Sequence, residues 1–208
     1  MWGKLHDTPC WYRLVRMVGI VLFSGLFYLR LKGCGHIPLE GGVLLVSNHR
    51  SYLDPIVLTF VTRRRVNFMA KEELFRNPVF GYIIRKFGAF PLKRASFDRW
   101  AFVHAVELLR DGKVLAMFGE GTRSKSGHMG KLREGPLRVA RRARVPIAPV
   151  VIQGTGRVLP RGSRFPRMGT VSAAVGNLLS TDELKKGEKI GVLVDRLRTE
   201  MIKLGASE

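Results

Sequence analysis

Hydrophobic positions along the chain form two recurring patterns, short apolar runs and longer amphipathic stretches. The run GVLLVSN at 42–48 is bounded by glycine and by a polar end, which is typical of a buried strand. In 97–110, Phe102, Val106 and Leu109 recur at helical spacing. The same reasoning predicts strands at 42–48, 65–69, 89–91, 113–118, 146–154 and 170–175, and helices at 54–61, 77–87, 97–110, 133–142 and 181–204.

Polar residues and prolines mark where these helices begin. Asp54 is expected at the N-cap of the helix at 54–61, with Pro55 in its first turn, and Asn77-Pro78 opens the next helix. Thr181 is expected to cap the last helix. Strands that alternate with helices predict an α/β fold, with a largely parallel central sheet and helices on both faces. In such sheets, sites gather beyond the carboxyl ends of the strands.

The N-terminal segment at 11–31 is a candidate membrane-associating helix. Its uncharged stretch at 17–29 lies between Arg16 and Arg30 and would span about 20 Å as a helix, against a hydrocarbon core of about 30 Å. We therefore expect a helix embedded in one leaflet, and the alternative is an ordinary buried helix that covers the domain. Its expected anchors are Trp2, Trp11, Tyr12 and the flanking arginines.

The length of 208 residues suits one main folding unit with a substantial core. We divide the chain into an N-terminal membrane-associating helical segment, 1–31, and an α/β domain, 32–208. Cys10 and Cys34 are the two cysteines, and neither lies in a CxxC pattern or near a histidine cluster. We therefore expect neither a disulfide framework nor a metal site.

A strong positive charge narrows the choice of partners. The formal net charge is +20, and within 121–170 the one acid, Glu134, stands among many arginines and lysines. The electric field of so much positive charge attracts nucleic acid, acidic lipid or phosphorylated substrates. The simpler alternative is that these basic residues form a solvated surface. The chain has no helix-turn-helix signature, zinc-ligand spacing or aromatic-rich RNA-binding run, so no nucleic-acid partner is expected.

The first candidate for chemistry is the pair His49 and Asp54. His49 directly follows a predicted strand, and Asp54 opens the next helix. A tight turn would bring the carboxylate to one ring nitrogen and leave the other nitrogen free to accept a proton. The alternative is that Asp54 caps its helix and His49 is a loop residue. No GxSxG nucleophile motif is present, so His49 would act as a base on a substrate hydroxyl.

A glycine-containing turn, FGEGTRS at 118–124, follows another predicted strand. Gly119 and Gly121 would let backbone amides approach a ligand closely, Thr122 adds a hydroxyl, and Arg123 is a bidentate anion donor. Glu120 would either orient Arg123 or bind a substrate hydroxyl. The alternative is an ordinary glycine turn with a surface arginine.

Two further cations, Lys71 and Arg94, also follow predicted strands. Each taken alone is more typical of a solvated charge. Together with Arg123 they could converge on one phosphate near His49, because the carboxyl ends of parallel strands meet at one edge.

These elements, in this order, resemble the motifs of the glycerolipid acyltransferase family, in particular its members that acylate lysophosphatidate. HX4D matches 49–54 within a fuller NHxSxxDP at 48–55, and VPIxPV matches 145–150. FPEGTRS matches 118–124 except that Gly119 replaces the proline, which would loosen the turn. A further element of the family, KxEL…P…G with a later arginine, is matched at Lys71, Glu73, Leu74, Pro78, Gly81 and Arg94.

The resemblance implies an acyl thioester donor, on coenzyme A or acyl-carrier protein, with lysophosphatidate as acceptor and phosphatidate as product. It implies that His49 deprotonates the sn-2 hydroxyl, that Asp54 orients His49, and that 32–208 is the acyltransferase domain. It further implies a substrate-binding set without metal or cofactor, in which the cations grip the phosphate and Glu120 contacts the glycerol: Lys71, Arg94, Glu120, Gly121, Thr122 and Arg123.

Other readings remain beside this one. The acceptor could be glycerol-3-phosphate, another lysophospholipid or a lyso-amino lipid. More distant alternatives are a basic nucleic-acid-binding module and a non-catalytic lipid-binding scaffold. The membrane-associating segment leads us to expect a peripheral or monotopic protein at the cytoplasmic face of the cell membrane, with the membrane surface and lysophospholipid as partners.

Overall fold

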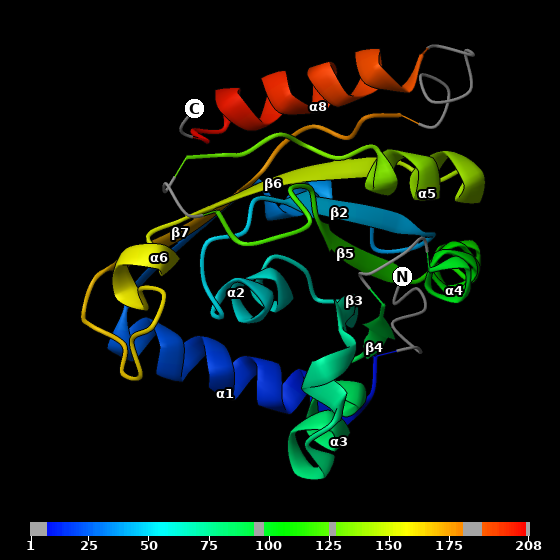
Figure 1. The fold of residues 1–208 in the computed structure, drawn as a ribbon. Helices are drawn as coiled ribbons and strands as arrows, with labels where there is room; N and C mark the ends of the chain where they lie inside the picture. Colours follow the sequence, from blue (N-terminus) through cyan, green and yellow to red (C-terminus); the bar gives the residue numbers. More distant parts are fainter. Residues whose placement is uncertain (1–7, 94–97, 125–127, 181–188, 207–208) are drawn as a thin grey trace.

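A seven-stranded sheet forms the centre of the molecule (Figure 1). The computed structural model describes residues 8–93, 98–124, 128–180 and 189–206. The strands are β1 (Tyr28–Lys32), β2 (Val43–Ser47), β3 (Val66–Lys71), β4 (Ala89–Leu92), β5 (Val114–Phe118), β6 (Ile147–Gln153) and β7 (Thr170–Val175), in the order β1-β7-β6-β2-β5-β3-β4. Every neighbouring pair is parallel except β6 and β7, which confirms the largely parallel sheet. Strands β2 to β6 therefore end at one edge.

Helices cover both faces of this sheet, as predicted (Figure 1). They are α1 (Cys10–Leu26), α2 (Asp54–Phe60), α3 (Pro78–Lys86), α4 (Arg99–Arg110), α5 (Gly135–Ala143), α6 (Thr155–Val158) and α8 (Ile190–Lys203), with short 3-10 turns η1 (Cys34–His36) and η2 (Glu72–Phe75). Successive side chains of β2 enter opposite hydrophobic clusters. Leu44 packs with α4, α5 and α8, whereas Leu45 packs with α1 and α2.

Polar side chains cap the first turns of α3 and α4. The side chain of Asn77 accepts a hydrogen bond from the Phe80 amide at 2.9 Å, which caps α3. Asp98 caps α4 in the same way through the Ala101 amide at 3.0 Å. The predicted strands and the helices between 54 and 143 agree with the structure to within a few residues.

Two expectations are wrong. Helix α1 ends at Leu26, and 28–32 forms β1, which pairs with β7 at the edge of the sheet. The expected boundary between 31 and 32 therefore falls inside a strand. Leu53, not Asp54, holds the N-cap of α2, and Asp54 is its first residue. The expected cap Thr181 lies outside the described residues, within which the last helix begins at Ile190.

One side of α1 is tied to the domain. Tyr12, expected as a membrane anchor, is buried, and its hydroxyl accepts a hydrogen bond from the Val66 amide at 3.3 Å. The Arg16 guanidinium donates to the carbonyls of Thr59 and Phe60, both at 2.9 Å, at the carboxyl end of α2. Burial lowers the pKa of Arg16. Since Arg16 turns inward, α1 is anchored on α2.

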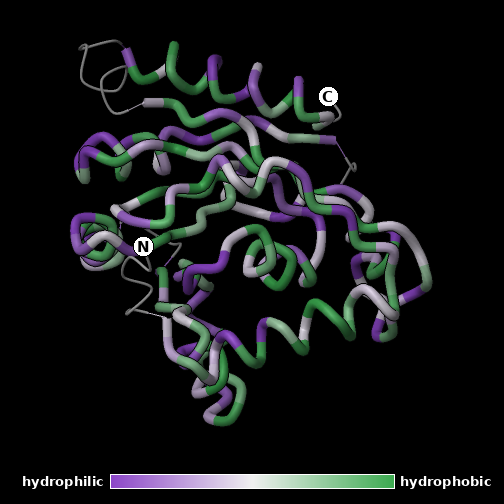
Figure 2. The backbone as a smooth tube through the Cα atoms, turned by 180° about the vertical axis from the view of Figure 1, so that it is seen from behind, coloured by the Kyte–Doolittle hydropathy of each residue, from purple (hydrophilic) through white to green (hydrophobic). Residues whose placement is uncertain are grey.

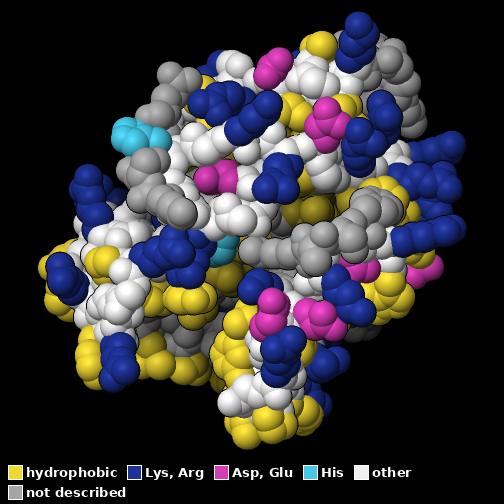
Figure 3. Space-filling view, in the orientation of Figure 1, with side chains coloured by type: hydrophobic (Ala, Val, Ile, Leu, Met, Phe, Trp, Pro, Cys, Tyr) yellow, Lys and Arg dark blue, Asp and Glu magenta, His cyan; other side chains and the backbone are white. Residues whose placement is uncertain are grey.

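The other side of α1 is exposed and apolar. Leu14, Val21, Leu22 and Leu26 are each more than half exposed. Hydrophobic positions continue from the central strands into α2 and along much of α1 (Figure 2), and hydrophobic side chains gather over α1 and α3 at the lower edge of Figure 3. Within the described parts of the chain, no helix is long and apolar enough to cross a membrane.

Candidate active site

His49 and Asp54 are in contact. The distance from His49 Nδ1 to Asp54 Oδ2 is 2.8 Å, and the His49 side chain is 13% exposed while that of Asp54 is 1% exposed. A carboxylate accepts hydrogen bonds, so Nδ1–H of His49 is the donor. The lone pair is then on Nε2, which is the nitrogen able to take a proton.

Asp54 is held by donors on several sides. Its Oδ2 also accepts the backbone amides of Arg50 at 2.6 Å and Ser51 at 2.7 Å. Its Oδ1 accepts the hydroxyl of Thr155 at 2.6 Å, and Thr155 is fully buried at the start of α6. The turn at 49–54 thus wraps around the carboxylate, which explains why Asp54 does not cap α2.

The imidazole of His49 is also packed against a ring. Phe118, the last residue of β5, stacks on it with centroids 3.8 Å apart and planes inclined by 12°. Asn48, buried just before His49, donates to the Ile152 carbonyl at 2.9 Å and accepts the Ile152 amide at 2.8 Å. These contacts join the ends of β2, β5 and β6 and limit the movement of His49.

Glu120 supports the loop that carries His49. The Glu120 side chain is buried and accepts the His49 amide at 3.2 Å and the Gly130 amide at 3.1 Å, while the Ser124 amide donates to the His49 carbonyl at 2.8 Å. Both Glu120 oxygens thus accept backbone amides of the protein. Among the described contacts its carboxylate has these two partners, and neither is the expected Arg123.

The two glycines of this turn make room for neighbouring side chains. A Cβ on Gly119 would lie 2.7 Å from a methyl of Leu132, and one on Gly121 would lie 3.0 Å from Arg133 Nε. Gly121 also has a positive φ of 72°. Both glycines therefore have a packing role, and Gly119 is closely packed despite standing where the family has proline. The expectation that they let amides approach a ligand stays a prediction.

Arg123 lies over the ring of Tyr52. The guanidinium carbon is 3.8 Å from the ring centroid, and Nη2 donates to the Tyr52 hydroxyl at 3.1 Å. Thr122 is exposed beside it. Because Tyr52 belongs to the turn between His49 and Asp54, the ring places the arginine next to the His49 loop.

Lys71 lies at the end of β3 and pairs with Glu73 at 2.8 Å. The hydrogen bond from Lys71 lowers the pKa of the Glu73 carboxyl. Arg94 lies outside the described residues. The expected convergence of Lys71, Arg94 and Arg123 on one phosphate therefore stays a prediction.

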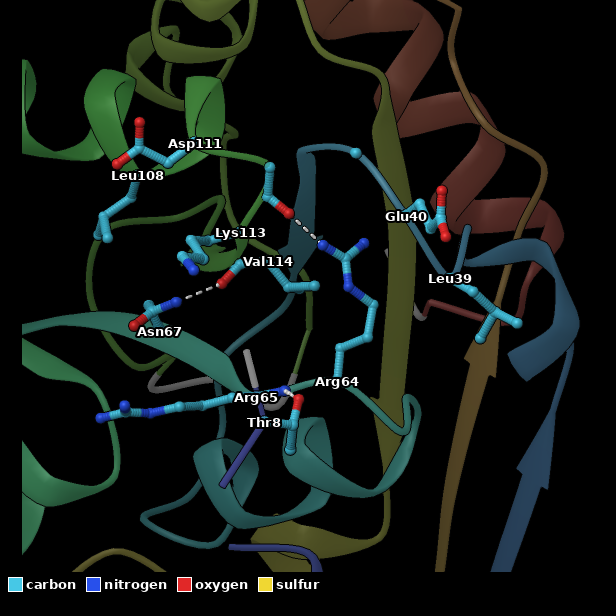
Figure 4. A pocket seen from close by; sticks show the side chains of 12 residues that line it. Thr8, Leu39, Glu40, Arg64, Arg65, Asn67, Leu108, Asp111, Lys113 and Val114 are labelled. Carbon is cyan, nitrogen blue, oxygen red and sulfur yellow. Dashed lines mark hydrogen bonds between the residues drawn. The ribbon is translucent and has the colours of Figure 1, made fainter. Parts of the chain in front are cut away.

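Two cavities lie at opposite edges of the sheet. The first, of about 960 Å³, is the α6 cavity, whose lining includes Arg50, Ser124, His128, Arg157 and Arg161. It adjoins the His49 loop because Arg50 directly follows His49. The second, of about 380 Å³, lies at the start of β3 and β5 (Figure 4). Its Arg64 donates to the carbonyls of Pro38 at 3.0 Å and of Gly112, so this arginine supports the turns there.

Thr155, Phe118 and Asn48 are the contacts of the pair to which the sequence reasoning gave no role. Thr155 lies 101 residues from Asp54, and a buried hydroxyl after a strand carries no spacing signal of its own. Asn48 directly precedes His49, and Phe118 is the first residue of the motif at 118–124. These positions were the available signal. A histidine held by a buried carboxylate and stacked on a ring is suited to general-base chemistry.

Comparison with known proteins shows the family of the chain. The family model described as Acyltransferase matches residues 29–153, which is more than half of the chain. The chain therefore belongs to the acyltransferase family, and the resemblance seen in its motifs is confirmed.

Three relatives show where in the family the similarity lies. The chloroplastic 1-acyl-sn-glycerol-3-phosphate acyltransferase LPAT1 of Arabidopsis thaliana is 33% identical over 66% of this chain and 39% of its own length. The 1-acyl-sn-glycerol-3-phosphate acyltransferase of Streptococcus pneumoniae is 33% identical over 77% of this chain and 60% of its own length. The crystal structure of the LPA acyltransferase PlsC from Thermotoga maritima superposes with a TM-score of 0.78 at 26% identity, over 94% of this chain and 80% of that one. The chain thus spans about 39% to 60% of the two curated relatives.

Proposed function

We propose that the protein transfers an acyl group from an acyl thioester, on coenzyme A or acyl-carrier protein, to the sn-2 hydroxyl of lysophosphatidate, which gives phosphatidate. The observation that carries this proposal is the His49–Asp54 contact of 2.8 Å, in a chain of the acyltransferase family. The names of the relatives support the choice of acceptor.

In this mechanism, Nε2 of His49 takes the proton of the sn-2 hydroxyl as its oxygen attacks the thioester carbonyl. The tetrahedral intermediate collapses, the carbon–sulfur bond breaks, and His49 returns the proton to the leaving thiolate. Asp54 orients the ring and stabilises the imidazolium. General-base action of this kind contributes about 10²–10⁴ in rate. The amides of His49, Arg50 and Ser51 already bind carboxylates of the protein, so the oxyanion requires other donors.

Arg123 is the proposed main ligand of the acceptor phosphate, with Lys71 and Arg94 as further cations. Stacking on Tyr52 holds the guanidinium of Arg123 beside the His49 loop, and its planar fork suits a phosphate. Glu120 acts in this proposal by holding the backbone at His49, with Gly121 and Thr122 in the same loop. No metal or cofactor takes part.

An acceptor panel tests the substrate. The purified, detergent-solubilised protein is assayed with acyl-CoA and acyl-carrier protein against lysophosphatidate, glycerol-3-phosphate, lysophosphatidylcholine and a lyso-amino lipid. We expect the highest kcat/KM for lysophosphatidate. Arg123→Gln should lower that value while it changes little for an acceptor without a phosphomonoester. A higher kcat/KM for another acceptor would refute lysophosphatidate as the substrate and would make that other molecule the acceptor of the same reaction.

We also propose that the protein binds the cytoplasmic face of the cell membrane through α1, as a peripheral or monotopic protein. The exposed apolar side of α1 supports this, since burial of one such side chain is worth about 1.5–3 kcal/mol. Val79 and Tyr82 on α3, both more than half exposed, extend the apolar area.

Vesicle binding tests this orientation. The triple variant Leu14→Ser/Val21→Ser/Leu22→Ser should lose at least about tenfold in affinity for phosphatidylglycerol-containing vesicles. Val192→Ser on α8 is the matched control, because Val192 is half exposed on the opposite side of the molecule (Figure 1). Substitution is preferable to deletion, since β1 begins at Tyr28. Equal binding of the triple variant and the control would refute the role of α1.

A further inference from the structure

The loop that follows α6 exposes basic and apolar side chains together. We call residues 161–168 the arginine loop. Phe165 is 80% exposed and Met168 is 70% exposed, and no aspartate or glutamate occurs in the sequence from 135 to 181. The three arginines of the loop are all exposed: Arg161, Arg164 and Arg167. The loop itself therefore carries positive charge alone, around two large apolar side chains.

Backbone contacts fix the shape of the arginine loop from its inner side. The Arg167 amide donates to the carbonyl of the buried Val158 at 2.7 Å, which closes the loop on α6. The Ser163 amide donates to the Pro160 carbonyl at 3.1 Å, and its hydroxyl donates to the Phe165 carbonyl at 2.8 Å. These contacts use the backbone and a short hydroxyl. The exposed guanidinium groups and the Phe165 ring therefore project from a loop that is already held in place.

The arginine loop lies beside the carboxyl end of α1 (Figure 1). The Tyr28 amide donates to the Gly169 carbonyl at 3.1 Å, and Tyr28 pairs with Thr170 where β1 and β7 begin. Tyr28 is 68% exposed and Leu26 is 55% exposed, so the exposed apolar area of α1 continues toward the loop. Hydrophobic and basic side chains gather together at the lower left of Figure 3. One extended surface can therefore contact both α1 and the loop.

This continuity separates the possible anionic partners of the arginine loop. Arginine binds phosphate with its planar fork, and aromatic and thioether side chains suit the layer just beneath lipid headgroups. A soluble polyanion such as nucleic acid would bind the arginines and leave the apolar side of α1 in water. An anionic bilayer covers both regions at once, so it is the partner that the observations favour.

The segment that leads into the arginine loop also supports the catalytic pair. Thr155, the first residue of α6, donates to Asp54 at 2.6 Å. The Ser51 hydroxyl donates at 3.0 Å to the carbonyl of Leu159, shortly before the loop begins. A surface bound by the loop therefore lies at a fixed position relative to His49.

We propose that the arginine loop is a second membrane contact, which binds the phosphates of anionic phospholipids through its arginines and inserts Phe165 and Met168 between the lipids. The inference rests on the proposed membrane binding through α1, and it adds a site and a preference for anionic headgroups. Helix α1 supplies apolar area that is indifferent to the headgroup, whereas the loop supplies the dependence on lipid charge. The two contacts together fix how the His49 loop faces the bilayer.

The test is sedimentation of the full-length protein with vesicles of phosphatidylcholine, alone or mixed with phosphatidylglycerol. The loop variant is Arg164→Gln/Arg167→Gln, at two exposed arginines outside the lining of the α6 cavity. The matched control, Arg141→Gln/Arg142→Gln, removes the same charge from exposed positions on α5, which packs on the opposite face of the sheet from α1. The loop variant should lose at least about tenfold in affinity for the anionic vesicles and little for phosphatidylcholine alone. The control should keep both affinities.

Insertion of the apolar side chains is tested separately. Phe165→Ser/Met168→Ser should lose at least about tenfold in affinity for both kinds of vesicle, because the lost contact is apolar. Wild-type binding by this variant would overturn the insertion.

Acyl transfer in detergent distinguishes this inference from the proposed function, because no bilayer is present there. The loop variant should keep the wild-type kcat in detergent. A wild type that binds both kinds of vesicle equally, a loop variant that keeps the anionic preference, or a control that loses as much would overturn the proposal. Binding of RNA in preference to anionic vesicles, lost in the loop variant, would overturn it as well. Headgroup-dependent binding by a protein without acyl transfer activity would support this inference and refute the proposed function alone.

Discussion

Removal of the Thr155 hydroxyl probes how far Asp54 depends on support from outside its own turn. The hydroxyl is fully buried and donates to Asp54 Oδ1 at 2.6 Å, while the three other donors, His49 Nδ1 and the amides of Arg50 and Ser51, all reach Oδ2. Thr155→Val keeps the shape of the side chain and leaves Oδ1 without this donor. A hydrogen bond to a charged group is worth about 1.5–3 kcal/mol.

If the whole of that free energy acts on the orientation of Asp54 toward His49, kcat falls by between about tenfold and about a hundredfold. The assay is steady-state acyl transfer to lysophosphatidate with kcat and both KM values measured separately. Thr155→Ser, which retains the hydroxyl, should recover most of kcat. Because the effect acts through Asp54, the KM values should stay near those of the wild type. Wild-type kcat in a folded Thr155→Val protein, or no recovery by Thr155→Ser, would refute the reasoning.

Three further substitutions test other contacts. Phe118→Leu removes the ring stacked on His49, a contact worth about 0.5–1.5 kcal/mol, and should lower kcat by about two- to tenfold; a change in stability with unchanged kcat would contradict this. Asn48→Ala leaves the buried amide and carbonyl of Ile152 without their partner and should lower the free energy of unfolding in urea by about 2–6 kcal/mol; a loss below about 1 kcal/mol would contradict it. Arg16→Met removes two hydrogen bonds to the end of α2 and should lower the same quantity by about 1–2 kcal/mol. An unchanged free energy of unfolding would contradict the anchoring role of Arg16.

Local patterns in the sequence were sufficient to predict most of the sheet. Strands such as β2 are short apolar runs with polar ends, and Asn77 precedes Pro78 at the start of α3. The error at 28–32 has a physical cause. YLRLK alternates leucine with more polar residues over only five positions, which is a weak strand signal. The strand β1 forms because β7, distant in the sequence, offers it an edge to pair with.

The spacing of His49 and Asp54 alone was equally compatible with a helix cap and a loop residue, and the accompanying motifs favoured the contact that the structure shows. The residues that hold this pair in place were less predictable. Thr155 reaches Asp54 through tertiary packing of α6, and Glu120 turns from the expected Arg123 to the amides of His49 and Gly130. Such partners depend on how distant loops meet at the strand ends, which no single-sequence pattern encodes.

Arg16 on α1 is another residue whose contacts could not be predicted from the sequence. In the sequence it flanks an apolar stretch and looks like a residue that reaches toward the membrane surface. In the structure it reaches inward, because the unpaired carbonyls at the end of α2 lie beside it. The apolar side of α1 that remains exposed is the side that supports membrane binding.

The most direct test of the central claim is the rate of phosphatidate formation from lysophosphatidate by His49→Ala under saturating donor and acceptor. The thermal unfolding midpoint of the variant should stay near that of the wild type, which shows that the fold is kept. With His49 as the general base, kcat should fall by about 10²–10⁴ while binding of the substrates persists. A folded His49→Ala protein that forms phosphatidate at the wild-type rate would contradict the account.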